Sequence, residues 1–84
     1  MNLTPREIKI AKAILDYLHG LDGGQAHALT LHAEIGGMAT CSAVEFDGVL
    51  GALDIRQYVL GIHTKFKGRM WNISDAGEAA RLQM

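Results

Sequence analysis

The chain has 84 residues, which is enough for one domain spanning residues 1–84 and too few for two. With 49% hydrophobic and 20% charged residues, its composition is that of an ordinary globular protein and excludes a disordered or low-complexity chain. The formal net charge of −1 hides an uneven distribution. Residues 21–54 contain five carboxylates and no lysine or arginine, whereas residues 55–84 contain five basic residues and two acidic ones.

The N-terminal segment is charged within its first turn, so it predicts neither a signal peptide nor a membrane span. Cys41, the single cysteine, excludes an internal disulfide framework and fits a reducing compartment. We therefore expect a cytoplasmic protein that does not enter a membrane.

The first predicted helix begins at Thr4 and Pro5 and ends at Gly20. Thr4 and Glu7 have the spacing of a capping box, and Pro5 falls at the first helical position. Apolar residues then recur with a period of 3.6 on one side of the helix, which predicts an amphipathic helix packed on a core. Residues 21–24 are expected to form a loop.

Residues 25–35 are ambiguous between a helix and a strand. Ala28, Leu31 and Ile35 have helical spacing, but Leu29, Leu31, Ala33 and Ile35 also alternate as in a strand. We expect a short helix that ends at Gly36 and Gly37.

A third helix is predicted over residues 42–54, since Ser42 and Glu45 form a second capping box. Its core face consists of residues spaced i, i+3, i+4 and i+7, namely Phe46, Val49, Leu50 and Leu53. Two strands follow, over residues 57–64 and 70–73, with a turn at Lys67 and Gly68. A short terminal helix is capped by Ser74 or Asp75.

Three segments carry a resemblance to a known family: the run from Ser42 to Leu53, the hydrophobic segment 58–61, and the segment Trp71-Asn72-Ile73-Ser74-Asp75-Ala76-Gly77. In these segments the chain resembles the winged helix-turn-helix family. Members are common among bacterial and phage regulators. The resemblance covers nearly the whole chain and implies an α+β fold, in which a three-helix bundle is followed by a β-hairpin wing and a short C-terminal helix.

In this family the third helix usually enters the DNA major groove and the wing touches the DNA backbone. The resemblance therefore implies a transcription-regulator-like protein that binds double-stranded DNA. Residues 42–54 take the recognition position, and residues 66–70 take the tip of the wing. The candidate phosphate contacts are the basic residues in and before the hairpin, namely Lys65, Lys67, Arg69 and Arg56.

The third helix departs from this pattern, because its outer face has no side chain suited to reading a base edge. That face presents small and apolar residues flanked by two carboxylates, namely Val44, Glu45, Asp47, Gly48, Gly51 and Ala52. An alternative hypothesis is that this face binds a basic protein surface or a second copy of the chain. Gly48 and Gly51 would then allow close approach of a partner, unless they pack against the second helix or are simply tolerated.

The sequence predicts no catalytic site, metal or cofactor. The four histidines lack metal-ligand spacing, since His27 and His32 point to different sides of a helix. Cys41 has no neighbouring base and is expected to be an inert thiol, and Ser42 is explained as a helix cap. Trp71 is expected in the core. We therefore expect a binding protein and no enzyme.

Overall fold

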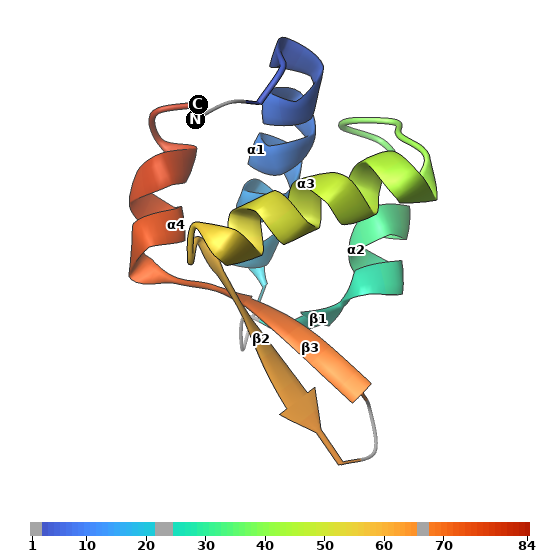
Figure 1. Cartoon of the computed structure of the whole chain (residues 1–84), viewed down its shortest axis with the longest axis vertical. Helices are drawn as coiled ribbons and strands as arrows, with labels where there is room; N and C mark the ends of the chain where they lie inside the picture. The colour runs from blue at the N-terminus through green and yellow to red at the C-terminus, as the bar shows by residue number, and fades with distance from the viewer. Residues whose placement is uncertain (1–2, 22–24, 66–67) are drawn as a thin grey trace.

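The computed structural model describes residues 3–21, 25–65 and 68–84. Within these ranges the elements follow the order α1 (Pro5–Gly20), β1 (Ala26–His27), α2 (Ala28–Ile35), α3 (Ala43–Ile55), β2 (Val59–Thr64), β3 (Gly68–Ile73) and α4 (Asp75–Arg81). The helices gather at one end of the molecule, and β2 and β3 extend away from them as a hairpin (Figure 1). This arrangement agrees with the expected α+β architecture of helices followed by a wing.

The helix starts follow from local capping. Thr4 and Ser42 each accept a hydrogen bond from the backbone amide three residues on, and Glu7 and Glu45 bond back to the cap amides. Both predicted capping boxes are therefore confirmed, and of the two residues expected to cap the terminal helix it is Ser74 that caps α4. The third helix runs one residue beyond its expected end, to Ile55.

The ambiguous segment is divided between a strand and a helix. Ala26 and His27 form β1, which pairs antiparallel with Trp71 and Met70 of β3, and α2 begins immediately afterwards. In the described part of the chain the sheet is three-stranded, with the order β1-β3-β2. The sequence predicted the hairpin but not β1. The strand β2 begins at Val59, two residues later than expected, since Gln57 has a positive φ of 61° and forms a turn.

The core lies between α1, α2, α3 and the base of the sheet. Its largest fully buried side chains include Phe46 of α3, Leu31 and Ile35 of α2, and Ile14 of α1. The predicted inner face of α3 is confirmed, because Phe46, Val49, Leu50 and Leu53 are all buried. Trp71 is 7% exposed and belongs to this core, as expected. Burial of α3 along this face fixes which of its residues point outward.

The C-terminal helix is tied to α1 by polar contacts. Arg81 Nε lies 2.9 Å from an Asp16 carboxylate oxygen, and His19 Nδ1 lies 2.6 Å from a Glu78 oxygen. The start of α4 also bonds to the turn before the wing, because the Ser74 amide donates to the Tyr58 carbonyl at 3.0 Å. These contacts place α4 on the side of the bundle away from α2 (Figure 1).

Candidate nucleic-acid interface

The outward face of α3 is uncovered. Val44 is 82% exposed, and Asp47, Gly48 and Gly51 are exposed as well, with Ala52 half-buried at the margin. Among the described residues, no atom outside the helix lies within 4 Å of the position that a Cβ would take at Gly48 or Gly51. The two glycines therefore do not pack against α2, and they leave the backbone of α3 open to a close approach from outside.

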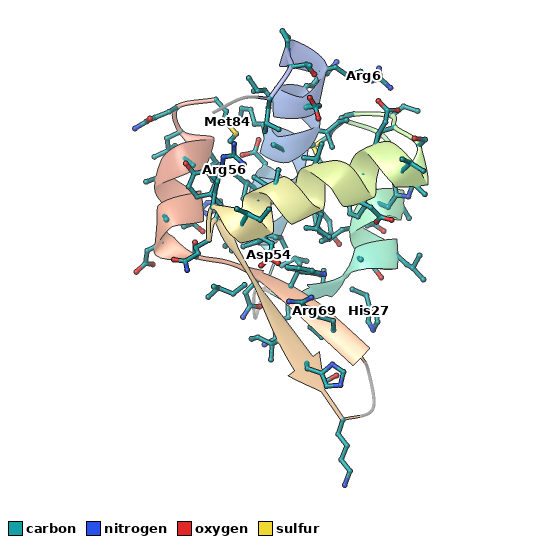
Figure 2. All side chains as sticks on the ribbon, in the orientation of Figure 1. Arg6, His27, Asp54, Arg56, Arg69 and Met84 are labelled. Carbon is teal, nitrogen blue, oxygen red and sulfur yellow. The ribbon has the colours of Figure 1, made fainter. Side chains whose placement is uncertain are left out.

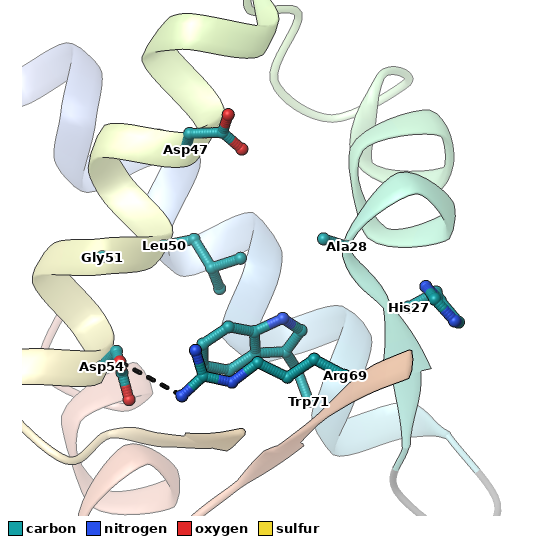
Figure 3. Close-up of a pocket in the computed structure, with 8 residues that line it drawn as sticks. All are labelled: His27, Ala28, Asp47, Leu50, Gly51, Asp54, Arg69 and Trp71. Carbon is teal, nitrogen blue, oxygen red and sulfur yellow. Dashed lines mark ion pairs between the residues drawn. The ribbon is translucent and has the colours of Figure 1, made fainter. Parts of the chain in front are cut away.

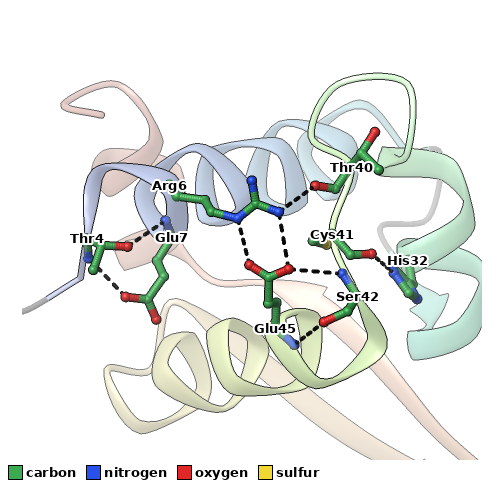
Figure 4. Close-up of polar contacts among 8 residues, drawn as sticks. All are labelled: Thr4, Arg6, Glu7, His32, Thr40, Cys41, Ser42 and Glu45. Atoms are coloured by element: carbon green, nitrogen blue, oxygen red, sulfur yellow. Dashed lines mark hydrogen bonds and ion pairs between the residues drawn. The ribbon is translucent and has the colours of Figure 1, made fainter.

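Glu45 is not a free carboxylate on this face. Arg6 of α1 donates to both of its oxygens, from Nε at 2.6 Å and from Nη2 at 3.1 Å, and Arg6 also donates to the Thr40 carbonyl (Figure 4). The hydrogen bond from Arg6 and that from the Ser42 amide lower the pKa of Glu45 from 4.5 to about 2. This carboxylate thus fastens the start of α3 to α1, and it adds little negative charge to the outer face.

The lowered pKa of Glu45 predicts a loss of stability in acid. A depressed carboxyl pKa stabilises the fold above the unfolded-state value, and the contribution disappears as the pH falls from about 4.5 towards about 2. We expect the melting temperature of the wild type to fall more steeply over this range than that of Glu45→Gln. Thermal unfolding followed by circular dichroism at several pH values measures it. Equal slopes for the two proteins would show that the Arg6 contact contributes nothing to stability.

The wing is a tight hairpin that begins to pair again immediately after its turn. Thr64 pairs with Gly68, whose φ is +70°, and the Thr64 hydroxyl donates to the Gly68 carbonyl at 2.7 Å. The expected strand start at Met70 and turn at Gly68 are therefore wrong: β3 begins at Gly68, so residues 68–70 belong to the strand and not to the tip of the wing. Lys65 is exposed in the turn. Lys67 and Phe66 lie outside the described residues.

Arg69 turns back from β3 towards α3 and does not project from the wing. Its guanidinium carbon lies 4.7 Å from the centre of the Trp71 ring, and its Nη2 lies 3.9 Å from an Asp54 oxygen (Figure 3). Arg69 and Trp71 are two residues apart in one strand, so they share a face of the sheet. The sequence grouped Arg69 with the lysines of the turn, whereas in the structure its side chain lies against Trp71 and near Asp54.

Arg56 lies just beyond the C-terminal end of α3. Its Nη1 donates to the Ala52 carbonyl at 3.1 Å, so the side chain satisfies a carbonyl in the last turn of the helix. In Figure 2, Arg56 lies on the side of Met84 and Arg69 on the side of the wing. Two of the candidate phosphate contacts therefore lie at different places in the described structure, Arg56 beyond the end of α3 and Arg69 against Trp71.

An open groove runs between α3, the start of α2 and the face of β3 that carries Arg69. It has a volume of about 440 Å³ and is lined by His27, Ala28, Asp47, Leu50, Gly51, Asp54, Arg69 and Trp71 (Figure 3). Leu50 and Trp71 supply apolar surface, and the two aspartates and Arg69 supply charge. The side chain of Asp47 has no ion pair or hydrogen bond with another residue in the described part of the chain.

This groove could not be predicted from the sequence because four separate elements form it, namely β1, α2, α3 and β3. One part of the groove could have been predicted, namely the place of Arg69 beside Gly61. A hairpin whose register is centred on residue 66 pairs Gly61 with Trp71. The alternation of Arg69 with Trp71 then places a guanidinium above the glycine. Asp54 could not be found in this way, because its distance from Arg69 depends on how α3 packs against the sheet.

Other candidate chemistry finds no support in the described residues. No cluster of three histidine, cysteine or carboxylate side chains there could hold a metal ion. His32 donates to the Cys41 carbonyl at 2.8 Å and stacks on Phe46, so it serves the packing of α2. Burial, followed by the Glu45 carboxylate, raises the pKa of Cys41. None of the helices in the described ranges has the length and apolar character needed to cross a bilayer.

A comparison with solved structures finds RosR of H. salinarum, which superimposes with a TM-score of 0.74. The match covers 98% of this chain and 70% of the RosR chain, with 15% sequence identity. The chain shares its fold with RosR. At this identity the likeness to RosR concerns the fold alone, and it extends over the helices and the hairpin described above. No family model and no curated protein matches the sequence.

Proposed function

We propose that the protein is a transcription-regulator-type winged-helix protein that binds double-stranded DNA and is not an enzyme. The observation that carries this proposal is the uncovered outward face of α3 beside the wing. These are the two elements that the winged-helix resemblance assigns to DNA contact. No segment in the described ranges covers this helix face, which therefore suits the groove of a large, regular partner such as a DNA duplex.

The α3 contact would be shallow and of low sequence specificity. Val44 lies in the first turn of α3, where recognition helices reach base edges, and an exposed valine can contact a thymine methyl group. Gly48 and Gly51 allow the helix backbone to approach the DNA closely. Because α3 presents no basic or amide side chain on this face, affinity would come mainly from the phosphate backbone.

The phosphate contacts come from the wing. Lys65 is exposed beside the turn, Lys67 follows it in the sequence, and the side chain of Arg69 reaches back from β3 towards α3. Arg56 adds positive charge just beyond the C-terminal end of α3. In this proposal Asp47 and Asp54 oppose DNA binding, since both carboxylates line the groove next to α3.

A second candidate function is recognition of a basic protein surface. The specific observation that favours it is the Asp47 carboxylate, which has no partner among the described residues. It lines the groove and lies on the same helix face as the exposed Val44. A lysine or arginine of the partner would pair with Asp47. This candidate uses the same face of α3 and predicts the opposite response to added positive charge.

Gly48→Arg tests which function is correct. The open space at Gly48 accommodates the side chain, and replacing a helical glycine stabilises α3 by up to about 1 kcal/mol. An added cation facing DNA is expected to tighten binding about eightfold at roughly 0.1 M salt, because one more counterion is released. Fluorescence anisotropy of a labelled random-sequence duplex measures the change.

Gly48→Gln is the matched control, since it adds a long side chain without charge. Tighter DNA binding by Gly48→Arg than by Gly48→Gln supports the DNA proposal. If Gly48→Arg is folded and binds duplex no better than Gly48→Gln, the α3 face does not meet DNA, and the protein-recognition function takes precedence.

A further inference from the structure

The side chain of Arg69 is held in one position between α3 and the wing. We call the surface that holds it, formed by Trp71 and Gly61, the Arg69 seat. The Arg69 guanidinium lies over the Trp71 ring, which is itself buried in the core, so the surface beneath the cation is rigid. A cation over an indole face gains about 0.5–1 kcal/mol at an exposed site. The Arg69 side chain is therefore held against the sheet, although 56% of its surface is exposed.

Gly61 of β2 makes room for this seat. It pairs with Trp71 across the hairpin, and a Cβ at this position would overlap Arg69 Nε and come within 2.9 Å of its Cζ. A glycine inside a strand weakens it and often marks the close approach of another group. Here the group that approaches is the Arg69 guanidinium.

Asp54 of α3 lies close to the Arg69 guanidinium but forms only a weak ion pair with it. Its oxygen is 3.9 Å from Arg69 Nη2, at the outer limit of an ion pair, and the two side chains are 39% and 56% exposed. Pairs of this kind contribute only about 0–1 kcal/mol. A guanidinium prefers an anion that accepts two parallel hydrogen bonds, as a phosphate does. Asp54 is therefore an occupant that a better anion can displace.

The groove leaves a path to Arg69 from solvent. Gly51 lies in the lining one turn before Asp54, and the space above it is open. Figure 3 shows the Arg69 guanidinium at the Trp71 ring, with Asp54 on one side of it and Leu50 towards Asp47. The path is the one that a DNA backbone would follow when α3 lies in a groove and the wing lies beside it.

We propose that Arg69, seated on Trp71 by Gly61, forms a phosphate-binding site whose anion position is held by Asp54 in the free protein. A phosphate of the DNA backbone replaces Asp54 when the duplex binds. This inference rests on the proposed DNA-binding function. It adds that the Asp54 carboxylate competes with a DNA phosphate for Arg69. Asp54 thereby lowers the affinity for any duplex, whatever its sequence.

Asp54→Asn tests the competition, with Asp47→Asn as the matched control. Both substitutions remove one negative charge from the same groove and the same helix, but only Asp54 contacts Arg69. We expect Asp54→Asn to tighten duplex binding about two- to fivefold more than Asp47→Asn does, as expected from an exposed ion pair. A carboxylate near a helix C-terminus is unfavourable, so Asp54→Asn should remain folded.

Combining each substitution with Arg69→Gln completes the experiment. Without Arg69, Asp54→Asn and Asp47→Asn should have equal effects, and the salt slope should fall by about one. The emission of Trp71, the one tryptophan in the sequence, reports whether the seat is intact in each variant. Equal effects of the two asparagine variants with Arg69 present would overturn the inference while DNA binding stands. If no variant binds duplex at low salt, the proposed function fails, and the inference fails with it.

Discussion

Gly77→Ala is expected to destabilise the protein by about 3 kcal/mol, because overpacking against backbone has no easy relief. Gly77 is buried in the first turn of α4, and an added Cβ would overlap the Tyr58 carbonyl oxygen and lie 2.8 Å from Ile73 Cγ1. The Tyr58 carbonyl also accepts the Ser74 amide, so it cannot move without loss of that bond. For a domain of this size the melting temperature should fall by about 15 °C.

Gly48→Ala is the control for this substitution. It makes the same chemical change in α3, where a Cβ meets open space, and is expected to raise stability by up to about 1 kcal/mol. Urea unfolding of the two variants and the wild type gives the free energies. A Gly77→Ala variant as stable as the wild type would mean that α4 does not dock against Tyr58 as described.

Reversing both lysines of the wing, in Lys65→Glu with Lys67→Glu, is expected to weaken duplex binding by about 50-fold or more at roughly 0.1 M salt. Each lost phosphate contact removes about one counterion from the binding equilibrium, so the salt slope should fall by about two. Lys65 is exposed, and Lys67 lies outside the described residues, so the pair is chosen on sequence and position in the hairpin. Anisotropy titrations at two salt concentrations measure both quantities.

Lys9→Glu provides the control for charge. Lys9 is exposed on α1, and its reversal changes the net charge as much as Lys65→Glu alone does. Only a small loss of affinity is expected for Lys9→Glu, because α1 is not part of the proposed interface. If Lys9→Glu and Lys65→Glu weaken binding equally, the wing is not a phosphate contact, and overall charge accounts for the affinity.

The elements set by neighbouring residues could be predicted from the sequence. Capping at Thr4, Ser42 and Ser74 depends on groups within three residues, so the helix starts were predicted correctly. The strand β1 could not be predicted, since it is two residues long and exists only through its pairing with Trp71 and Met70. The apolar residues of the segment 25–35 fit both a strand and a helix, so their spacing could not show where β1 ends and α2 begins.

The charge of the candidate site could not be predicted from the sequence. Counting residues gave an acidic third helix, but Glu45 is bonded to Arg6, 39 positions earlier in the chain. Asp54 likewise lies beside Arg69, which the sequence assigned to the tip of the wing. The first pairing depends on how α3 packs against α1 and the second on how α3 packs against the sheet, and periodicity within one element carries no information about either. The proposed contacts of Lys65, Lys67, Arg69 and Arg56 with DNA stay predictions.

The most direct measurement is a titration of the folded protein with a random-sequence duplex at low salt, followed through its amide and indole NMR signals. We expect the largest shifts at the outward positions of α3, at Val44, Asp47, Gly48 and Gly51, along the wing, and at the Trp71 indole. That result would place DNA on the face shared by α3 and the wing. Unchanged spectra, or shifts confined to α1 and α4, would contradict the account.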